Sequence, residues 1–140
     1  MIYKKILVPL DGSPLAEIAA RHAAKVSRLT AGKLIFLRIA TPETAKEAAA
    51  YLENVNEEAY FDGLDAQAIV GLGQPAQRIV QTAREIGVDL IVLSSHGRTG
   101  LARQVFGSVA EEVMRAAACP VTVVKSFQSP DDGVRSSQAV

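Results

Sequence analysis

Five short apolar runs alternate along the chain with segments of helical periodicity, and this alternation limits the fold more than any other feature of the sequence. The runs are 4–9, 34–39, 66–72, 90–93 and 121–124. Continuous apolar runs are typical of parallel strands that helices cover on both faces. Strands that alternate with helices predict an α/β fold with right-handed crossovers. We therefore expect an open, Rossmann-like sheet of five parallel strands, in the order 3-2-1-4-5, with helices on both faces.

The first helix is predicted directly after the first apolar run. Turn residues 11–13 precede Pro14, and proline is favoured at the first position of a helix. Residues spaced by three or four positions then form the expected inward-facing stripe, which comprises Leu15, Ile18, His22, Val26 and Leu29. His22 is accordingly interpreted as a packing residue.

The second and third helices are predicted from apolar periodicity and from the glycine and proline residues around it. A stripe over 45–59 predicts the second helix, with Gly63 marking its end. Pro75 and Gly87 bracket the third, because glycine is enriched just past the last helical residue. Each helix therefore fills the crossover between two consecutive strands.

The composition indicates a single globular domain. Apolar residues make up 49% of the chain and charged residues 21%, which is typical of globular proteins. We expect one domain over 1–126 and a solvated, flexible tail over 127–140, where serine, aspartate and glutamine are frequent. No apolar run approaches the roughly 20 residues that a membrane helix needs.

Charge and cysteine content indicate the cytoplasm and exclude nucleic acid as the main partner. Lysine plus arginine and aspartate plus glutamate each total 15, so no global positive field favours a phosphate backbone. The lone Cys119 cannot form an internal disulfide, which fits a reducing compartment. The N-terminus lacks the long apolar segment of a secretory signal. We therefore expect a cytoplasmic protein without a membrane partner.

The expected sheet order also predicts where a ligand binds. In the order 3-2-1-4-5 the chain reverses its winding direction between the first and fourth strands. Ligands of such sheets bind at the carboxyl ends of the strands, at this switch point. The crevice is therefore expected between the connections that follow Pro9 and Leu93.

The strongest motif lies in the connection after the fourth run. Its pattern is Ser94-x2-Gly97-x9-Gly107-Ser108. Glycines there let backbone N–H groups approach a polyanion at the positive end of a helix dipole. Ser108 and Glu111 also match a capping box, so we expect Ser108 to cap the next helix. Tight turns and a helix cap explain the same residues equally well on geometry alone.

Two further residues of this connection are candidates for a phosphate site. Arg98 would add a positive charge, and His96 would orient the loop or contact a phosphate. No carboxylate or cysteine set accompanies His96 in sequence, so neither a metal site nor a catalytic base is inferred. We assign no catalytic residue.

These residues resemble the universal stress protein family, whose ATP-binding branch carries Gly-x2-Gly-x9-Gly-Ser/Thr in the same strand-to-helix connection. Ser94 stands where that pattern has its first glycine, whereas Gly97, Gly107 and Ser108 match it. The resemblance covers about residues 2–125. It extends to the segments 8–13, 73–75 and 119–124.

The resemblance implies a nucleotide site assembled from both sides of the crevice. Residues at the ends of the first two strands would contact ribose and base, and the connection after the fourth would hold the phosphates. With Arg98 added for its charge, the candidate nucleotide-binding residues are Pro9, Leu10, Asp11, Ile39, Leu93, Ser94, Gly97, Arg98, Gly107, Ser108 and Val109. A carboxylate such as Asp11 is a suitable acceptor for ribose hydroxyls, although a turn residue bonding nearby backbone is the alternative.

The leading hypothesis is an ATP-binding regulatory protein of the stress response, in which nucleotide occupancy orders the 95–106 loop. ATP would bind alone or with Mg²⁺ or Mn²⁺. One alternative is a slow ATPase or an autophosphorylating enzyme, and another is a nucleotide-free interaction module. A homodimer is expected in each case, because the last strand is an apolar edge formed by Val121, Thr122, Val123 and Val124.

Overall fold

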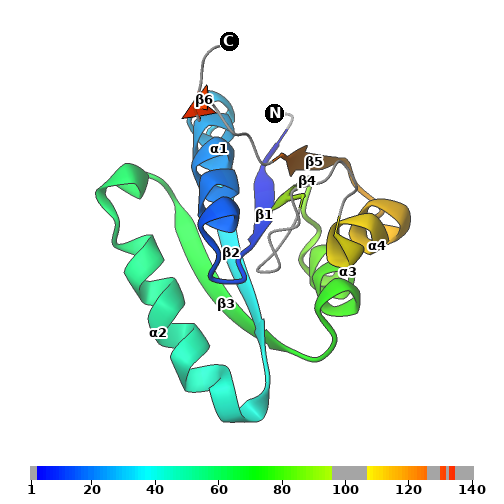
Figure 1. Cartoon of the computed structure of the whole chain (residues 1–140). Helices are drawn as coiled ribbons and strands as arrows, with labels where there is room; N and C mark the ends of the chain where they lie inside the picture. Colours follow the sequence, from blue (N-terminus) through cyan, green and yellow to red (C-terminus); the bar gives the residue numbers. More distant parts are fainter. Residues whose placement is uncertain (1–2, 96–106, 126–129, 132, 135–140) are drawn as a thin grey trace.

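The computed structural model describes residues 3–95, 107–125, 130–131 and 133–134 (Figure 1). Five strands form one parallel sheet in the order β3-β2-β1-β4-β5, so the predicted fold class and strand order are confirmed. With η marking short 3-10 helices, the elements are β1 (Lys5–Pro9), α1 (Pro14–Thr30), β2 (Lys33–Ala40), η1 (Pro42–Thr44), α2 (Ala45–Asn56), η2 (Ala59–Phe61), β3 (Ala66–Leu72), α3 (Pro75–Ile86), β4 (Leu90–Ser94), α4 (Ser108–Ala116), β5 (Val121–Val124), β6 (Pro130–Asp131) and β7 (Gly133–Val134).

Strands β1 and β4 lie at the centre of the sheet because their residues are apolar on both faces. Residues 6–8 and 91–92 are fully buried. Just before β4, the carboxylate oxygen Oδ2 of Asp89 accepts hydrogen bonds from the backbone N–H groups of Lys4 and Lys5, at 2.8 and 2.9 Å. The two strands therefore run side by side, and their carboxyl ends meet at the switch point.

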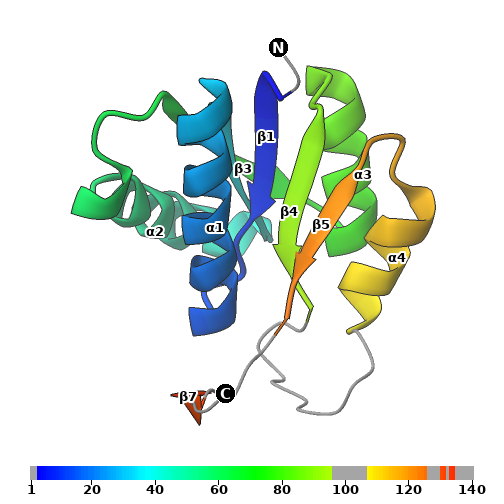
Figure 2. The ribbon, with the colours of Figure 1, turned by 90° about the horizontal axis from the view of Figure 1, so that it is seen from above.

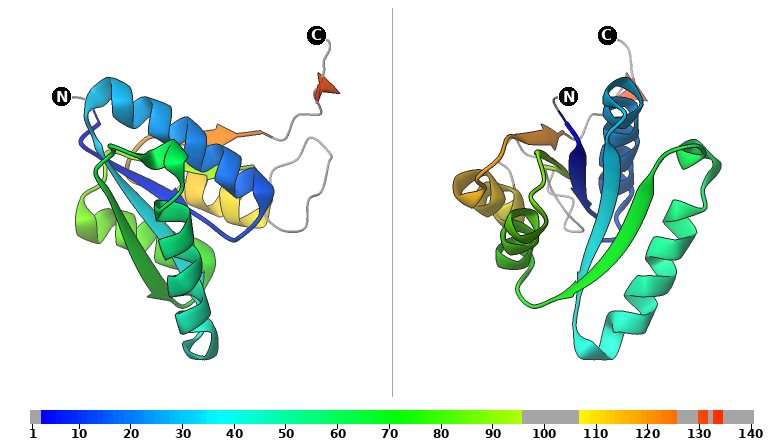
Figure 3. Two further views of the ribbon diagram at one scale, coloured as in Figure 1. Left: turned by 90° about the vertical axis from the view of Figure 1, so that its left-hand side faces the viewer. Right: turned by 180° about the vertical axis from the view of Figure 1, so that it is seen from behind.

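Helices cover both faces of the sheet, with α1 and α2 on one side and α3 and α4 on the other (Figure 2). Figure 3 shows the same layers from two further directions. Because successive residues of a strand point to opposite faces, Val8 belongs to the core under α1 and α2, and Leu7 to the core under α3 and α4. The first core contains Phe36 and Phe61, whose ring centroids lie 5.2 Å apart. The second contains Val113 of α4.

Helix α1 turns a different face to the sheet from the one expected. Its start is as predicted, with Pro14 in the first turn and the Ser13 hydroxyl accepting the Ala16 N–H at 3.1 Å. The predicted stripe is wrong at three positions, because Ile18 and Leu29 are 50% and 87% exposed and His22 is exposed as well. Val26 from the same stripe is partly buried and packs against the core. The buried face comprises Ala16, Ala19, Ala20, Ala23, Ala24 and Ser27.

The alanine face is displaced from the predicted stripe by one residue, a rotation of about 100°. Small side chains let the helix backbone lie close to the sheet and fill the space between them without voids. Larger apolar residues of α1 consequently remain at the margins of the helix.

Helix α2 is shorter than expected. It ends at Asn56, and the chain reaches Gly63 through η2 instead of continuing as one helix. From the predicted stripe, the buried residues of α2 are Ala48, Leu52 and Val55. Helix α3 agrees with expectation at both ends, since Pro75 lies in its first turn and Gly87 follows it with a φ of 78°.

Helix α4 starts where predicted but without the predicted cap. Gly107 is its N-cap residue, Ser108 is already helical, and no side chain of the described residues caps this end. The expected capping box of Ser108 and Glu111 is therefore wrong, because the hydroxyl lies one position too late in the chain.

No helix in the described part of the chain has the length and apolar character required to cross a membrane. The candidates His96, Gly97 and Arg98 lie outside the described residues. Apart from the short strands β6 and β7, so does the expected tail over 127–140.

Candidate functional site

A cavity opens at the carboxyl edge of the sheet, where β1 and β4 lie side by side. Its volume is about 310 Å³, at the lower end of the roughly 300–1,000 Å³ typical of ligand pockets. The β1–α1 connection, β2, α3 and the junction of β4 with α4 all contribute to its walls. The lining residues are Pro9, Leu10, Asp11, Ala16, Leu37, Ile39, Pro75, Ile79, Leu93, Ser94, Ser95, Gly107, Ser108, Val109 and Ala110.

The inner wall of the cavity is apolar. Leu37 and Ile39 reach it from β2, Ile79 from α3, Leu93 from β4 and Ala110 from α4. All of these except Ile39 are buried. A flat apolar ring placed against this wall would gain about 25 cal/mol for each Å² of apolar surface removed from water. The wall therefore suits a nucleobase or a ring of similar size.

Asp11 provides a carboxylate at the rim of the cavity. Its oxygen Oδ1 accepts the backbone N–H of Ser13 at 2.9 Å, so the turn role considered from sequence is real. Among the described residues, its second oxygen makes no hydrogen bond. One carboxylate can therefore hold the β1–α1 turn and still accept a hydrogen bond from a ligand hydroxyl.

The junction of β4 with α4 is held by backbone hydrogen bonds. Ser95 donates its N–H to the Val124 carbonyl at 2.9 Å, and Gly107 donates its N–H to the Ser95 carbonyl at 2.7 Å. These two bonds place the start of α4 directly beside the end of β4. Ser95 and Gly107, at the two ends of the connection predicted to hold phosphates, are thus adjacent.

The first turn of α4 offers backbone donors to the cavity. Its first intrahelical bond is donated by the N–H of Glu111 to the carbonyl of Gly107, at 3.0 Å. The N–H groups of Ser108, Val109 and Ala110 precede that bond, so they lack a partner within the helix. They also lie at the positive end of the helix dipole. Anions bind readily at such an end.

The structure brings the candidate residues on both sides of the switch point to this one cavity. Those that line it are Pro9, Leu10, Asp11, Ile39, Leu93, Ser94, Gly107, Ser108 and Val109. Gly97 and Arg98 lie outside the described residues. The structure shows that the candidate residues it describes line one cavity. Their contacts with a nucleotide remain a prediction.

Ser94 occupies the position where the resembling pattern has glycine. It is the last residue of β4 and pairs with Val124 of β5. Among the described residues other than glycine, only Ala31 has a positive φ. Ser94 therefore has a negative φ, a conformation that any L residue can adopt. The serine therefore fits this backbone without the strain that a left-handed conformation would impose.

Sequence reasoning missed five residues of the wall, namely Ala16, Leu37, Pro75, Ile79 and Ala110. Pro75 carries a usable signal, since it opens a helix after a strand and so lies at the carboxyl edge of the sheet. Ile79 and Ala110 carry none beyond helical periodicity, because only the packing of α3 against α4 brings them together.

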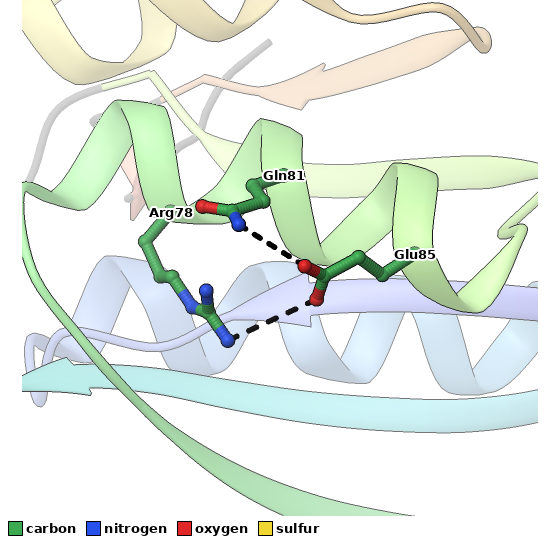
Figure 4. A network of polar contacts seen from close by, with 3 residues as sticks. All are labelled: Arg78, Gln81 and Glu85. Carbon is green, nitrogen blue, oxygen red and sulfur yellow. Dashed lines mark hydrogen bonds and ion pairs between the residues drawn. The ribbon is translucent and has the colours of Figure 1, made fainter.

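The exposed face of α3 carries a polar network outside the cavity lining (Figure 4). Arg78 Nη2 lies 3.9 Å from Glu85 Oε1, and Gln81 donates its amide N–H to Glu85 Oε2 at 3.0 Å. The stem of Arg78 packs against Gly71, where a Cβ would meet Arg78 Cγ at 3.1 Å. Within the described ranges, no group of three or more His, Cys, Asp or Glu side chains could hold a metal ion.

Comparison with known proteins agrees with this architecture. The model of the universal stress protein family matches residues 2–125. The universal stress protein MJ0577 of Methanocaldococcus jannaschii is 31% identical over 92% of this chain and 99% of its own length. The universal stress protein YxiE of Bacillus subtilis is 31% identical over 89% of this chain and 100% of its own length.

Solved structures give the same result. The structure of MJ0577 superposes with a TM-score of 0.80 at 35% identity, over 92% of this chain and 100% of that one. A universal stress protein from Archaeoglobus fulgidus, solved in complex with dAMP, gives a TM-score of 0.71 at 25% identity, over 89% and 100% of the two chains. By sequence and by fold, this chain belongs to the universal stress protein family.

Proposed function

We propose that the cavity binds ATP and that the protein is a nucleotide-responsive regulator in the stress response. The observation that carries this proposal is the convergence of three chemistries on one cavity. These are an apolar wall suited to a base, the Asp11 carboxylate suited to a ribose, and the N-terminal N–H groups of α4 suited to phosphates. The dAMP complex of the Archaeoglobus fulgidus relative supports an adenine nucleotide as the ligand class.

In the proposed complex, the base lies against Leu37 and Ile39, and the phosphates lie at Gly107 and Ser108. Gly97 and Arg98 would contribute from the 95–106 segment, which nucleotide occupancy would order. Ordering that segment would change the surface offered to a partner, so the nucleotide acts as a signal. Mg²⁺ or Mn²⁺ would enter with the phosphates. We place the regulator in the cytoplasm, where the lone Cys119 stays reduced.

Titration calorimetry with ATP and Mg²⁺ tests the proposal directly. We expect a dissociation constant in the micromolar range, with weaker binding of adenosine because it lacks the phosphates. Ribose 5-phosphate serves as the matched control that lacks the base, and it should also bind more weakly. Absence of heat up to millimolar ATP would refute the proposal. Nucleotide released by denaturing freshly purified protein provides an independent check.

We further propose a homodimer that forms through β5. This strand lies at the end of the sheet and pairs with β4 on one side. Its four residues, Val121–Val124, are half-buried in the chain as described, and an apolar edge of this kind favours pairing with a second copy. Light scattering at micromolar protein should give twice the monomer mass. A monomer mass would contradict this interface.

A further inference from the structure

Arg38 lies next to the β1–α1 loop that carries Asp11, and it does not line the cavity. It occupies β2 between Leu37 and Ile39, which both line the cavity. Because side chains alternate along a strand, Arg38 points to the opposite face, toward α1 and α2. It therefore reaches the β1–α1 loop from the side away from the proposed ligand.

The Arg38 guanidinium occupies the space that a side chain at position 12 of that loop would fill. A Cβ added to Gly12 would lie 2.7 Å from Arg38 Nη1 and 3.5 Å from its Cζ, and Gly12 has a φ of 88°. Any larger residue at position 12 would displace the guanidinium as well as strain the backbone. The glycine thus permits close packing immediately next to Asp11.

The other side of the guanidinium is fixed by Tyr51 of α2. Arg38 Cζ lies 4.8 Å from the centroid of the Tyr51 ring, in the range of a cation–π contact. The Tyr51 hydroxyl donates a hydrogen bond to Glu17 Oε2 of α1 at 2.6 Å. Helices α1 and α2 therefore hold the ring on which Arg38 rests.

This cluster is also coupled electrostatically to Asp11. Burial, together with the hydrogen bond to Glu17, raises the pKa of Tyr51 well above its usual value; the positive charge of Arg38 lowers it and the negative charge of Asp11 raises it. Arg38 Nη1 is shielded from solvent and has no hydrogen-bond partner among the described residues. A buried donor without a partner is destabilising, and Nε of Arg78 on α3 is in the same condition. The packing of Arg38 between Gly12 and the Tyr51 ring is what distinguishes it.

We propose that Arg38 is a positioning residue whose guanidinium, packed between Gly12 and the Tyr51 ring, fixes Asp11 so that its carboxylate selects a ribose 2′-hydroxyl over 2′-deoxyribose. In dinucleotide-binding doubly wound folds, a carboxylate about 20 residues beyond the first βα turn accepts a hydrogen bond from this hydroxyl. Asp11 presents the same chemical group to the cavity from the first βα turn itself. The inference rests on the proposed nucleotide function. It adds the residue that makes the ribose contact selective.

The test compares Arg38→Met with Arg78→Met. Both variants keep an unbranched stem, and Arg78 also has a buried nitrogen without a partner, but it lies on α3 away from the β1–α1 loop. Calorimetry with ATP and with 2′-deoxyATP gives the ribose selectivity of each protein. We expect about tenfold selectivity in the wild type, which corresponds to about 1.4 kcal/mol. It should fall to about twofold in Arg38→Met and stay unchanged in Arg78→Met.

Hydrogen exchange of the Ser13 amide provides a readout without ligand, because this N–H donates to Asp11 Oδ1. We expect Arg38→Met to accelerate its exchange about tenfold while Arg78→Met does not. Tyr51→Leu, which removes the ring beneath the guanidinium, should produce the same two changes if Arg38→Met fails to fold. Unchanged selectivity or unchanged Ser13 exchange in a folded variant would overturn the proposal. A wild-type protein that binds neither nucleotide would overturn the proposed function itself, and Ser13 exchange would still decide whether Arg38 holds the loop.

Discussion

The two walls of the cavity are built from different parts of the polypeptide and offer a ligand different chemistry. The wall from β1 and β2 presents side chains on strands of the buried core, with the Asp11 carboxylate at its rim. The wall from β4 and α4 presents the backbone N–H groups of Ser108, Val109 and Ala110. Side chains select by shape and by hydrogen bonding, whereas a row of backbone donors at a helix N-terminus selects by charge. We therefore expect base and ribose selectivity from the first wall and affinity for phosphate from the second.

The largest expected effect is a loss of ATP affinity when one backbone donor is removed from the wall formed by β4 and α4. Ser108→Pro deletes an N–H at the first helical position, where proline is well tolerated, and Gly107 before it already has the extended backbone that proline requires (φ −67°, ψ 163°). A hydrogen bond to a charged group contributes about 1.5–3 kcal/mol, so ATP should bind roughly 10- to 150-fold more weakly. Adenosine should bind as before. Calorimetry with both ligands measures the difference.

Ser108→Ala is the matched control for this experiment, because it removes the hydroxyl and keeps the N–H. Its loss of ATP affinity should be smaller than that of Ser108→Pro. Equal losses of ATP affinity in the two variants would assign the phosphate contact to the Ser108 side chain. The claim that this wall binds phosphate through backbone N–H groups would then be contradicted.

A smaller effect is expected from the side-chain wall. Asp11→Ala removes the acceptor proposed for the ribose, so adenosine should bind about tenfold more weakly, the equivalent of about 1.4 kcal/mol. ATP should lose less, because the same change removes a negative charge near its phosphates. Asp11→Asn keeps an acceptor oxygen for the Ser13 N–H and should lose less adenosine affinity than Asp11→Ala. Normal adenosine affinity in Asp11→Ala would contradict the assignment of ribose recognition to this wall.

The smallest effect is expected at the position where the chain departs from the family pattern. Ser94 ends a regular strand without a positive φ, so Ser94→Gly should change ATP affinity by less than about threefold, or roughly 0.6 kcal/mol. Competition against a fluorescent adenine nucleotide is sensitive enough to measure this. A tenfold gain on introducing glycine would instead show that the Ser94 side chain obstructs the phosphate wall.

The order of the strands and the place of the switch point were predictable because both follow from local patterns joined by general rules. Continuous apolar runs such as 90–93 identify central strands, and right-handed crossovers then leave few arrangements of the sheet. The residues at the carboxyl ends of β1 and β4 are consequently placed at one edge before any side chain is considered.

The buried face of α1 was not predictable in the same way. Alanines at 16, 20 and 23 and larger apolar residues at 15, 18 and 29 recur with the same helical spacing, so periodicity fits two faces about 100° apart. The distance between helix and sheet decides between them, and that distance depends on every side chain in the layer. The capping box failed for a related reason, since a shift of one residue at Gly107 moves the hydroxyl of Ser108 out of the capping position.

The sequence by itself determined the fold, the edge of the sheet that bears the cavity, and the candidate residues that follow β1 and β4. These properties depend on residues close together in the chain. Tertiary structure alone decided which side chains complete the site: the wall residues Ile79 and Ala110, and the contact of Arg38 with Gly12 and Tyr51. Those residues come from separate elements, and no local pattern records the packing distances that bring them together.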